Sequence, residues 1–112
     1  MILGAFLWDA RQAAGLIVEF LAGRSWDDYE NDALVRSAVE RQFEIVGEAL
    51  NQFGQTAPDL VERIPDLPRI VAFRNVLIHE YTKIDDRIVW EVAAERVPAL
   101  IALFDELIDE IG

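Results

Sequence analysis

The chain has 112 residues, of which 53 % are hydrophobic, with only 6 Gly and 4 Pro. This length and composition predict one folded domain over residues 1–112 and exclude disordered and fibrous classes of protein. The absence of cysteine excludes disulfides, thiol nucleophiles and cysteine-bound metal centres, and the single histidine argues against a transition-metal site. We therefore expect a cytoplasmic protein that needs no cofactor.

The chain is strongly acidic: it has 21 acidic and 10 basic residues, which give a net charge of −11. Such a surface should repel nucleic acid, since neutralisation of phosphates drives non-specific binding. A role with RNA would depend on a local site or on a basic partner protein. No run of 18 apolar residues occurs and the N-terminus lacks the basic start of a signal peptide, so we expect a soluble protein without a membrane span.

The first half of the chain carries two apolar patterns at helical spacing. The first pattern predicts a helix over Ala5–Leu21, which Gly23 ends, and the polar stretch SWDDYEND is expected to form a loop. The second pattern predicts a helix that starts near Asn31 or Asp32 and ends near Phe53, where Gly54 is a plausible C-terminal residue.

The second half is divided by prolines and by an acidic cap. Pro58 suits the first turn of a short helix over Pro58–Arg63. The next helix is predicted from Leu67 to His79 or Tyr81. Asp85 can cap a long final helix that reaches Ile111 and that Pro98 should kink.

No segment shows the sustained alternation of a strand, so these patterns predict an all-α protein. The expected architecture is an up-and-down bundle of four main helices plus one short helix. Several apolar rows are wider than a monomer of this size needs, and a homodimer would bury them.

The stretch FRNVLIHEY contains the only histidine of the chain, five residues after Arg74. On an ideal helix, Ile70, Leu77 and Ile78 fall within about 60° of Arg74, so the arginine lies in an apolar stripe. His79 falls about 140° away from it. The two side chains would not share one face of a regular helix, and a site using both would need a distorted helix, a folded-back arginine or two subunits.

A purely structural interpretation of these residues is also open. In that case Arg74 would pair with Glu44 or Glu48, and His79 would be a partly exposed residue at a helix end. Glu44 and Glu48 make too few ligands for a metal site. The three tryptophans are most simply explained as core or interface packing; they are Trp8, Trp26 and Trp90.

A longer stretch of the sequence around Arg74 and His79 favours the functional interpretation of these residues over the structural one. IVAFRNVLIHEY, followed by TKID and IVWEVAAERVPAL, resembles the HepT-like toxins of the HEPN superfamily, which carry an R-x4-H-x-Y motif. The earlier segment AVERQFEIVGEAL is similar to the family's E-x-x-G-E core. The resemblance covers residues 36–107 and implies an all-α dimer whose motif helices line a cleft at the interface. It also implies a metal-independent endoribonuclease, encoded beside a nucleotidyltransferase antitoxin called MntA.

The resemblance assigns roles to four residues. Arg74 would bind phosphate, His79 would transfer protons, and Asn75 would support them. Tyr81 would be the hydroxyl to which the antitoxin attaches AMP, adding negative charge at the cleft. The alternative is a HEPN dimer without nuclease activity that binds nucleotides or its partner protein.

Overall fold

The computed structural model describes residues 2–79 and 84–111, and these residues form helices and connecting turns without any strand. The all-α class predicted from the sequence is therefore confirmed. No helix in the described part of the chain is long and apolar enough to cross a membrane. The elements in chain order are α1 (Ile2–Leu21), α2 (Trp26–Glu30), α3 (Ala33–Thr56), the 3₁₀ helix η1 (Pro58–Arg63), α4 (Leu67–His79), α5 (Asp86–Glu95) and α6 (Val97–Ile111).

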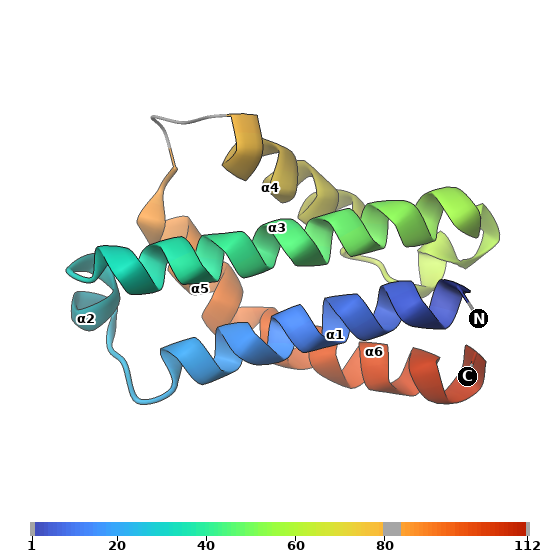
Figure 1. The fold of residues 1–112 in the computed structure, drawn as a ribbon, viewed down its shortest axis with the longest axis horizontal. Coiled ribbons are helices and arrows are strands. Elements are labelled where there is room, and N and C mark those ends of the chain that lie inside the picture. Colours follow the sequence, from blue (N-terminus) through green and yellow to red (C-terminus); the bar gives the residue numbers. More distant parts are fainter. Residues whose placement is uncertain (1, 80–83, 112) are drawn as a thin grey trace.

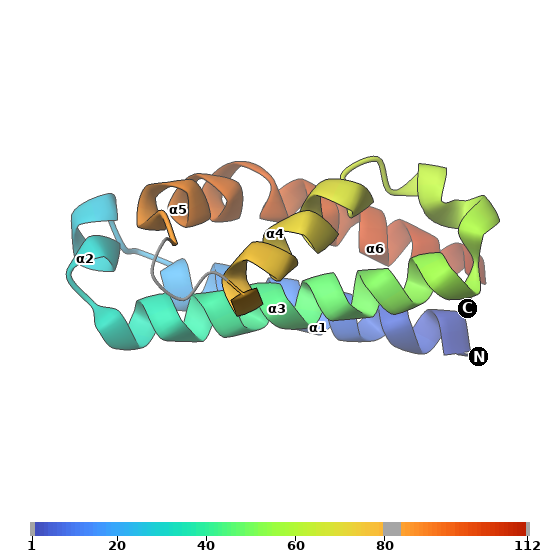
Figure 2. The ribbon, with the colours of Figure 1, turned by 90° about the horizontal axis from the view of Figure 1, so that it is seen from above.

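The long helices α1 and α3 run side by side in opposite directions (Figure 1), and α6 packs on the other side of α1. Helix α4 crosses α3 obliquely when the molecule is seen from above (Figure 2). Its C-terminal end stands away from the rest of the bundle. The first and last helical turns lie at the same end of the molecule.

The core lies between α1, α3 and α6, since these helices carry most of the fully buried side chains. Burial of each large apolar side chain contributes about 1.5–3 kcal/mol. The small buried alanines of α1 allow its neighbours to approach closely. The largest buried side chains of these three helices are Leu7, Ile17, Val39, Leu50, Phe53, Val97, Phe104 and Leu107.

The prediction of a loop after Gly23 was wrong, because α2 forms there. Ser25 and Asp28 make a capping box, in which each side chain accepts a hydrogen bond from the backbone N–H of the other residue. Tyr29 is fully buried and holds α2 to the bundle. Its ring packs against Trp26 and Trp90, with centroid distances of 6.1 and 5.5 Å.

Helix α3 ends later than predicted, since the end was expected near Phe53 with Gly54 as its C-terminal residue. The helix continues through Gly54 to Thr56, and Ala57 leaves the helical conformation with φ −132° and ψ 71°. The proline at position 58 explains this end point, since its ring disfavours the α conformation of the preceding residue. The helix starts where predicted: Asp32, one of the two residues expected at its start, caps α3 by accepting a hydrogen bond from the Val35 N–H.

The final helix is broken rather than kinked. Asp85 caps it as predicted, but α5 ends at Glu95, and α6 starts at Val97 after a break at Arg96. Pro98 has no N–H and cannot donate a hydrogen bond to the carbonyl one turn earlier, which weakens a continuous helix at this point.

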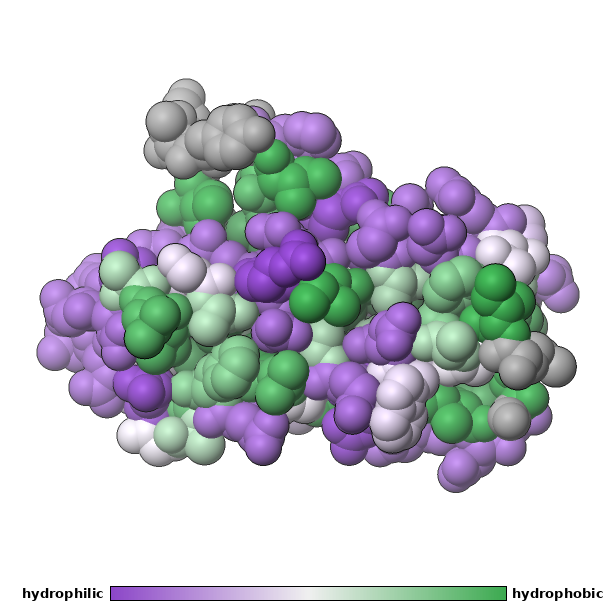
Figure 3. All heavy atoms as spheres, viewed as in Figure 1, coloured by the Kyte–Doolittle hydropathy of each residue, from purple (hydrophilic) through white to green (hydrophobic). Residues whose placement is uncertain are grey.

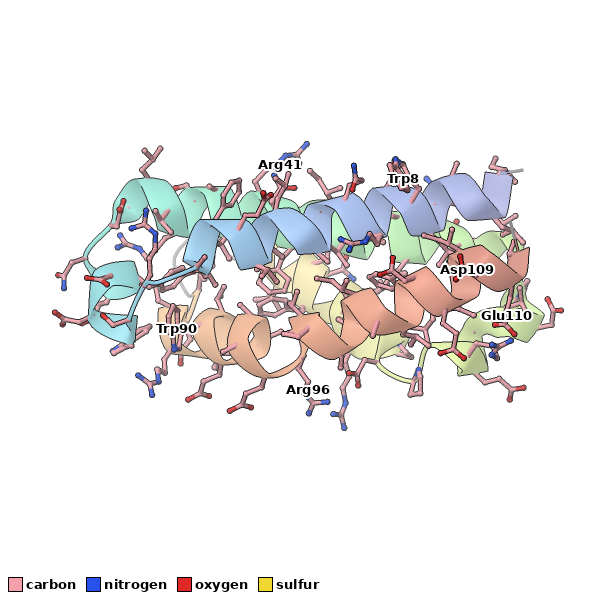
Figure 4. The ribbon with its side chains drawn as sticks, turned by 90° about the horizontal axis from the view of Figure 1, so that it is seen from below. Trp8, Arg41, Trp90, Arg96, Asp109 and Glu110 are labelled. Atoms are coloured by element: carbon pink, nitrogen blue, oxygen red, sulfur yellow. The ribbon has the colours of Figure 1, made fainter. Side chains whose placement is uncertain are left out.

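Helices α1 and α3 expose apolar and charged side chains side by side on their common outer face (Figure 3). Trp8 is 53 % exposed on this face, so it is not part of the core. Trp26 and Trp90 do pack against the core. Figure 4 shows Trp8 and Arg41 projecting on one side of the molecule and Arg96 on the opposite side.

Candidate active site

Arg74 lies where α4 crosses α3, and its side chain is only 14 % exposed. The neighbouring residue on α3 is Gly47. A Cβ atom at Gly47 would lie 2.3 Å from the Cβ and 2.6 Å from the Cγ of Arg74. The close crossing of the two helices therefore requires glycine at this position.

Glu48 holds the end of the Arg74 side chain, with its Oε2 accepting a hydrogen bond of 2.5 Å from the arginine Nη1. The same carboxylate accepts a second hydrogen bond, of 3.0 Å, from the Gln52 amide. Of the two carboxylates predicted as partners, Glu48 reaches Arg74, whereas Glu44 pairs with Arg41 at 3.3 Å. Glu48 is half exposed, so this pair lies at the edge of the α3–α4 contact.

The Nε atom of Arg74 is buried and has no hydrogen-bond partner among the described residues. A buried donor without a partner costs roughly 1–3 kcal/mol. Since only Nη1 bonds to Glu48, the guanidinium keeps unused donors. The arginine is thus anchored at one edge and can still bind a group with several acceptor oxygens.

His79 and Asn75 are exposed on α4, away from its contact with α3. His79 is the last residue of the helix, so its imidazole can be reached from solvent. Helix geometry predicted that Arg74 and His79 would not share one face of α4. In the structure Arg74 packs against α3 and His79 is exposed, in agreement with this prediction. Tyr81, the third motif residue, lies outside the described residues.

Among the residues that the structure describes, no cluster of three or more histidine, aspartate or glutamate side chains could hold a metal ion. Carboxylates do approach one another between α3 and the start of α5. Burial raises the pKa of Glu40, and the negative charge of Asp86 raises it further, although Arg36 opposes the shift.

Two residues of this region were not assigned roles from the sequence. Gln52 lies one turn after Glu48, and this i, i+4 spacing of amide and carboxylate is a signal that could have found it. Gly47 was noticed only as part of a resembling segment. Its contact with Arg74 depends on the crossing of two helices, which local sequence does not reveal.

The family model described as "Ribonuclease HepT-like" matches residues 10–107. The chain belongs to the HepT-like ribonuclease family. The HepT-like match includes the whole α3–α4 region with Gly47, Glu48, Arg74 and His79.

Two relatives of this HepT-like chain illustrate its similarity to known proteins. A protein of Methanocaldococcus jannaschii named "Putative RNase MJ1380" is 35 % identical over 98 residues, which cover 86 % of this chain and 87 % of the relative. A protein of Thermococcus cleftensis named "Probable ribonuclease HepT" is 32 % identical over 105 residues, which cover 91 % and 92 % of the two chains. No solved structure showed a significant match.

Proposed function

We propose that this HepT-like protein is a metal-independent endoribonuclease that works as a homodimer. The observation that carries the proposal is the state of Arg74, a largely buried cation that Glu48 anchors and whose buried Nε has no partner among the described residues. An arginine in that state suits the planar recognition of phosphate oxygens. Family membership and the names of the relatives support RNA as the substrate.

The need for a second copy follows from the direction of the side chains. Arg74 faces α3, whereas His79 and Asn75 are exposed on another side of α4. An apolar side chain, Val76, is 43 % exposed beside them. A second molecule placed against this surface of α4 would cover Val76 and bring the two copies of His79 to a shared cleft.

The chemistry needs two proton transfers and a positive charge. One His79 removes the proton of a ribose 2′-hydroxyl, whose oxygen attacks the adjacent phosphorus atom. The bond from phosphorus to the 5′-oxygen breaks, and the His79 of the second copy protonates this leaving oxygen. The products are a 2′,3′-cyclic phosphate and a free 5′-hydroxyl, while Arg74 stabilises the charge on the phosphorus oxygens.

Glu48 acts as a positioning residue in this scheme. It holds the Arg74 guanidinium by Nη1 and is itself held by Gln52. A phosphate must compete with this carboxylate for the arginine, which is consistent with weak general affinity for RNA in a chain of net charge −11.

The proposal also includes regulation of the ribonuclease by a nucleotidyltransferase antitoxin. Tyr81 follows His79 by two residues and would carry the attached AMP, whose phosphate would repel RNA from the cleft. Mass spectrometry of the protein co-expressed with a nucleotidyltransferase encoded beside it tests this step. The expected added mass is that of AMP on Tyr81, and it should be absent from Tyr81→Phe.

The central experiment is cleavage of total RNA and of a tRNA pool by purified, unmodified protein in EDTA. We expect cleavage of RNA but not of DNA of the same sequence, because DNA lacks the 2′-hydroxyl. His79→Ala should lower the rate by about 10²–10⁴-fold and Arg74→Ala by about 10²–10³-fold. Arg63→Ala, which removes the same charge from an exposed arginine in η1, is the matched control and should cleave like the wild type.

Three outcomes would contradict the proposal. Loss of activity in EDTA would overturn metal independence. Equal activity of wild type and His79→Ala would remove His79 from the mechanism. RNA or nucleotide binding without cleavage by the unmodified dimer would favour a binding module instead.

A further inference from the structure

A pocket of about 240 Å³ lies beside the contact of α4 with α3, and residues of α1, α3, α4, α5 and α6 line it. Its wall contains Ile70 and Phe73 of α4, and Phe73 packs edge-on against Phe43 of α3 with ring centroids 5.2 Å apart. Arg74, next in the chain, takes no part in the lining. The pocket is therefore separate from the candidate active site.

The interior of the pocket is apolar. Its apolar lining comes from α1, α3, α4 and α6, through Ala14, Phe43, Val46, Ile70, Phe73 and Leu100, and Val92 adds to it from α5. An apolar protein cavity of about 150 Å³ is large enough to bind benzene. The larger volume here can take one ring with a substituent or a short acyl chain.

The mouth of the pocket carries positive charge in an otherwise acidic protein. Arg69, Arg96 and Asp66 line it, and Asp66 accepts hydrogen bonds of 3.3 and 3.4 Å from Arg96. Within residues 2–79 and 84–111, eight of the nine arginines form an ion pair with a carboxylate, and Arg69 does not. Since Asp66 neutralises Arg96, the three residues Arg69, Arg96 and Asp66 together give the mouth of the pocket a net charge of +1.

We propose that this pocket binds a small amphipathic anion, with its apolar body between α4 and α6 and its acidic group against Arg69 and Arg96. The ligand class follows from the apolar lining and the charge at the entrance. A neutral molecule would leave Arg69 without a counter-charge, and a cationic one would be repelled. The inference does not rest on ribonuclease activity, because its test measures binding alone.

The experiment is an NMR titration of the full chain with octanoate, with 1-octanol and with octylamine as matched neutral and cationic probes. We expect octanoate to shift the methyl signals of Val46, Ile70 and Leu100, with an affinity above that of octanol. Octylamine should bind more weakly than either. Arg69→Gln should weaken octanoate binding by roughly threefold to tenfold and leave octanol binding unchanged.

A second variant tests the body of the pocket. Val92 lines it from α5 and is partly exposed, so a larger side chain there can turn into the pocket without disrupting the core. Val92→Phe should abolish binding of all three probes while its circular dichroism spectrum stays that of the wild type.

Several results would overturn the proposal. Equal affinity for octanoate, octanol and octylamine would show that the arginines select no anion. Octanoate shifts that stay the same in Val92→Phe would place binding elsewhere, and the absence of shifts would remove the site. Concentration-dependent shifts of the same methyl groups without any probe would show that a second copy of the chain fills the pocket.

Discussion

Helices α1 and α4 differ in how the bundle holds them. Helix α1 packs between α3 and α6 and buries Leu7 and Ile17 almost completely. Helix α4 packs mainly on α3 (Figure 2). In its C-terminal half, His79 and Val76 are exposed. Helices α1, α3 and α6 therefore hold most of the core, whereas the candidate catalytic residues lie on α4.

The largest expected effect on stability comes from the core. Phe104 of α6 is fully buried, so Phe104→Ala should lower the free energy of unfolding by about 3–5 kcal/mol, through lost burial and the cavity left behind. His79→Ala, on the exposed end of α4, should change it by no more than about 0.5 kcal/mol. Urea unfolding at one fixed protein concentration measures both. A large loss of stability in His79→Ala would contradict the view that the C-terminal end of α4 contributes little to stability compared with the core.

A smaller effect on stability is expected at the crossing of α3 and α4. Gly47→Ala places a Cβ 2.3 Å from the Cβ of Arg74, and neither atom can move unless the helices separate. We expect a loss of about 1–3 kcal/mol in the free energy of unfolding. Since Arg74 would be displaced with α4, RNA cleavage should fall as well.

Gly54→Ala in the same helix is the matched control. Its nearest neighbour, a Val61 methyl group, would lie 3.4 Å from the new Cβ, which is ordinary contact. This variant should be as stable as the wild type, or more stable by about 0.5–1 kcal/mol. If both glycine variants lost the same stability, the close approach of Arg74 would not be the cause.

The smallest predicted effect depends on pH. Because burial and Asp86 raise the pKa of Glu40 in the folded state, the folded protein binds this proton more tightly than the unfolded chain does. The stabilising contribution of this proton is fully present below the ordinary pKa of 4.5 and is lost as the pH rises through the raised value. Glu40→Gln should therefore be more stable than the wild type at neutral pH, by about 0.5 kcal/mol, and equally stable near pH 4.

Urea unfolding of this variant at the two pH values measures the difference. Asp86→Asn provides the control, since it removes one cause of the shift and should reduce the gain from Glu40→Gln when the two are combined. A Glu40→Gln variant that is less stable at both pH values would contradict the assignment.

Local signals in the sequence were sufficient for much of the fold. The start of α3 near Asp32, the cap at Asp85 and the short helix at Pro58 agree with the prediction, because each depends on hydrogen bonds or ring geometry within one turn of helix. The capping box of Ser25 and Asp28 is also a local signal, and it predicts the start of α2. The loop expected over this stretch did not take it into account. The break at Arg96 was underestimated as a kink.

Helical periodicity alone predicts that Arg74 and His79 point in different directions, because a spacing of five residues at 3.6 residues per turn places them about 140° apart on a regular helix. The pairing of Arg74 with Glu48 rather than Glu44, and the close contact that Gly47 permits, depend on how α4 crosses α3. The tertiary structure also placed an apolar pocket behind Phe73. The reason is physical: caps and helix faces depend on neighbouring residues, whereas ion pairs between helices and cavities depend on how whole helices cross.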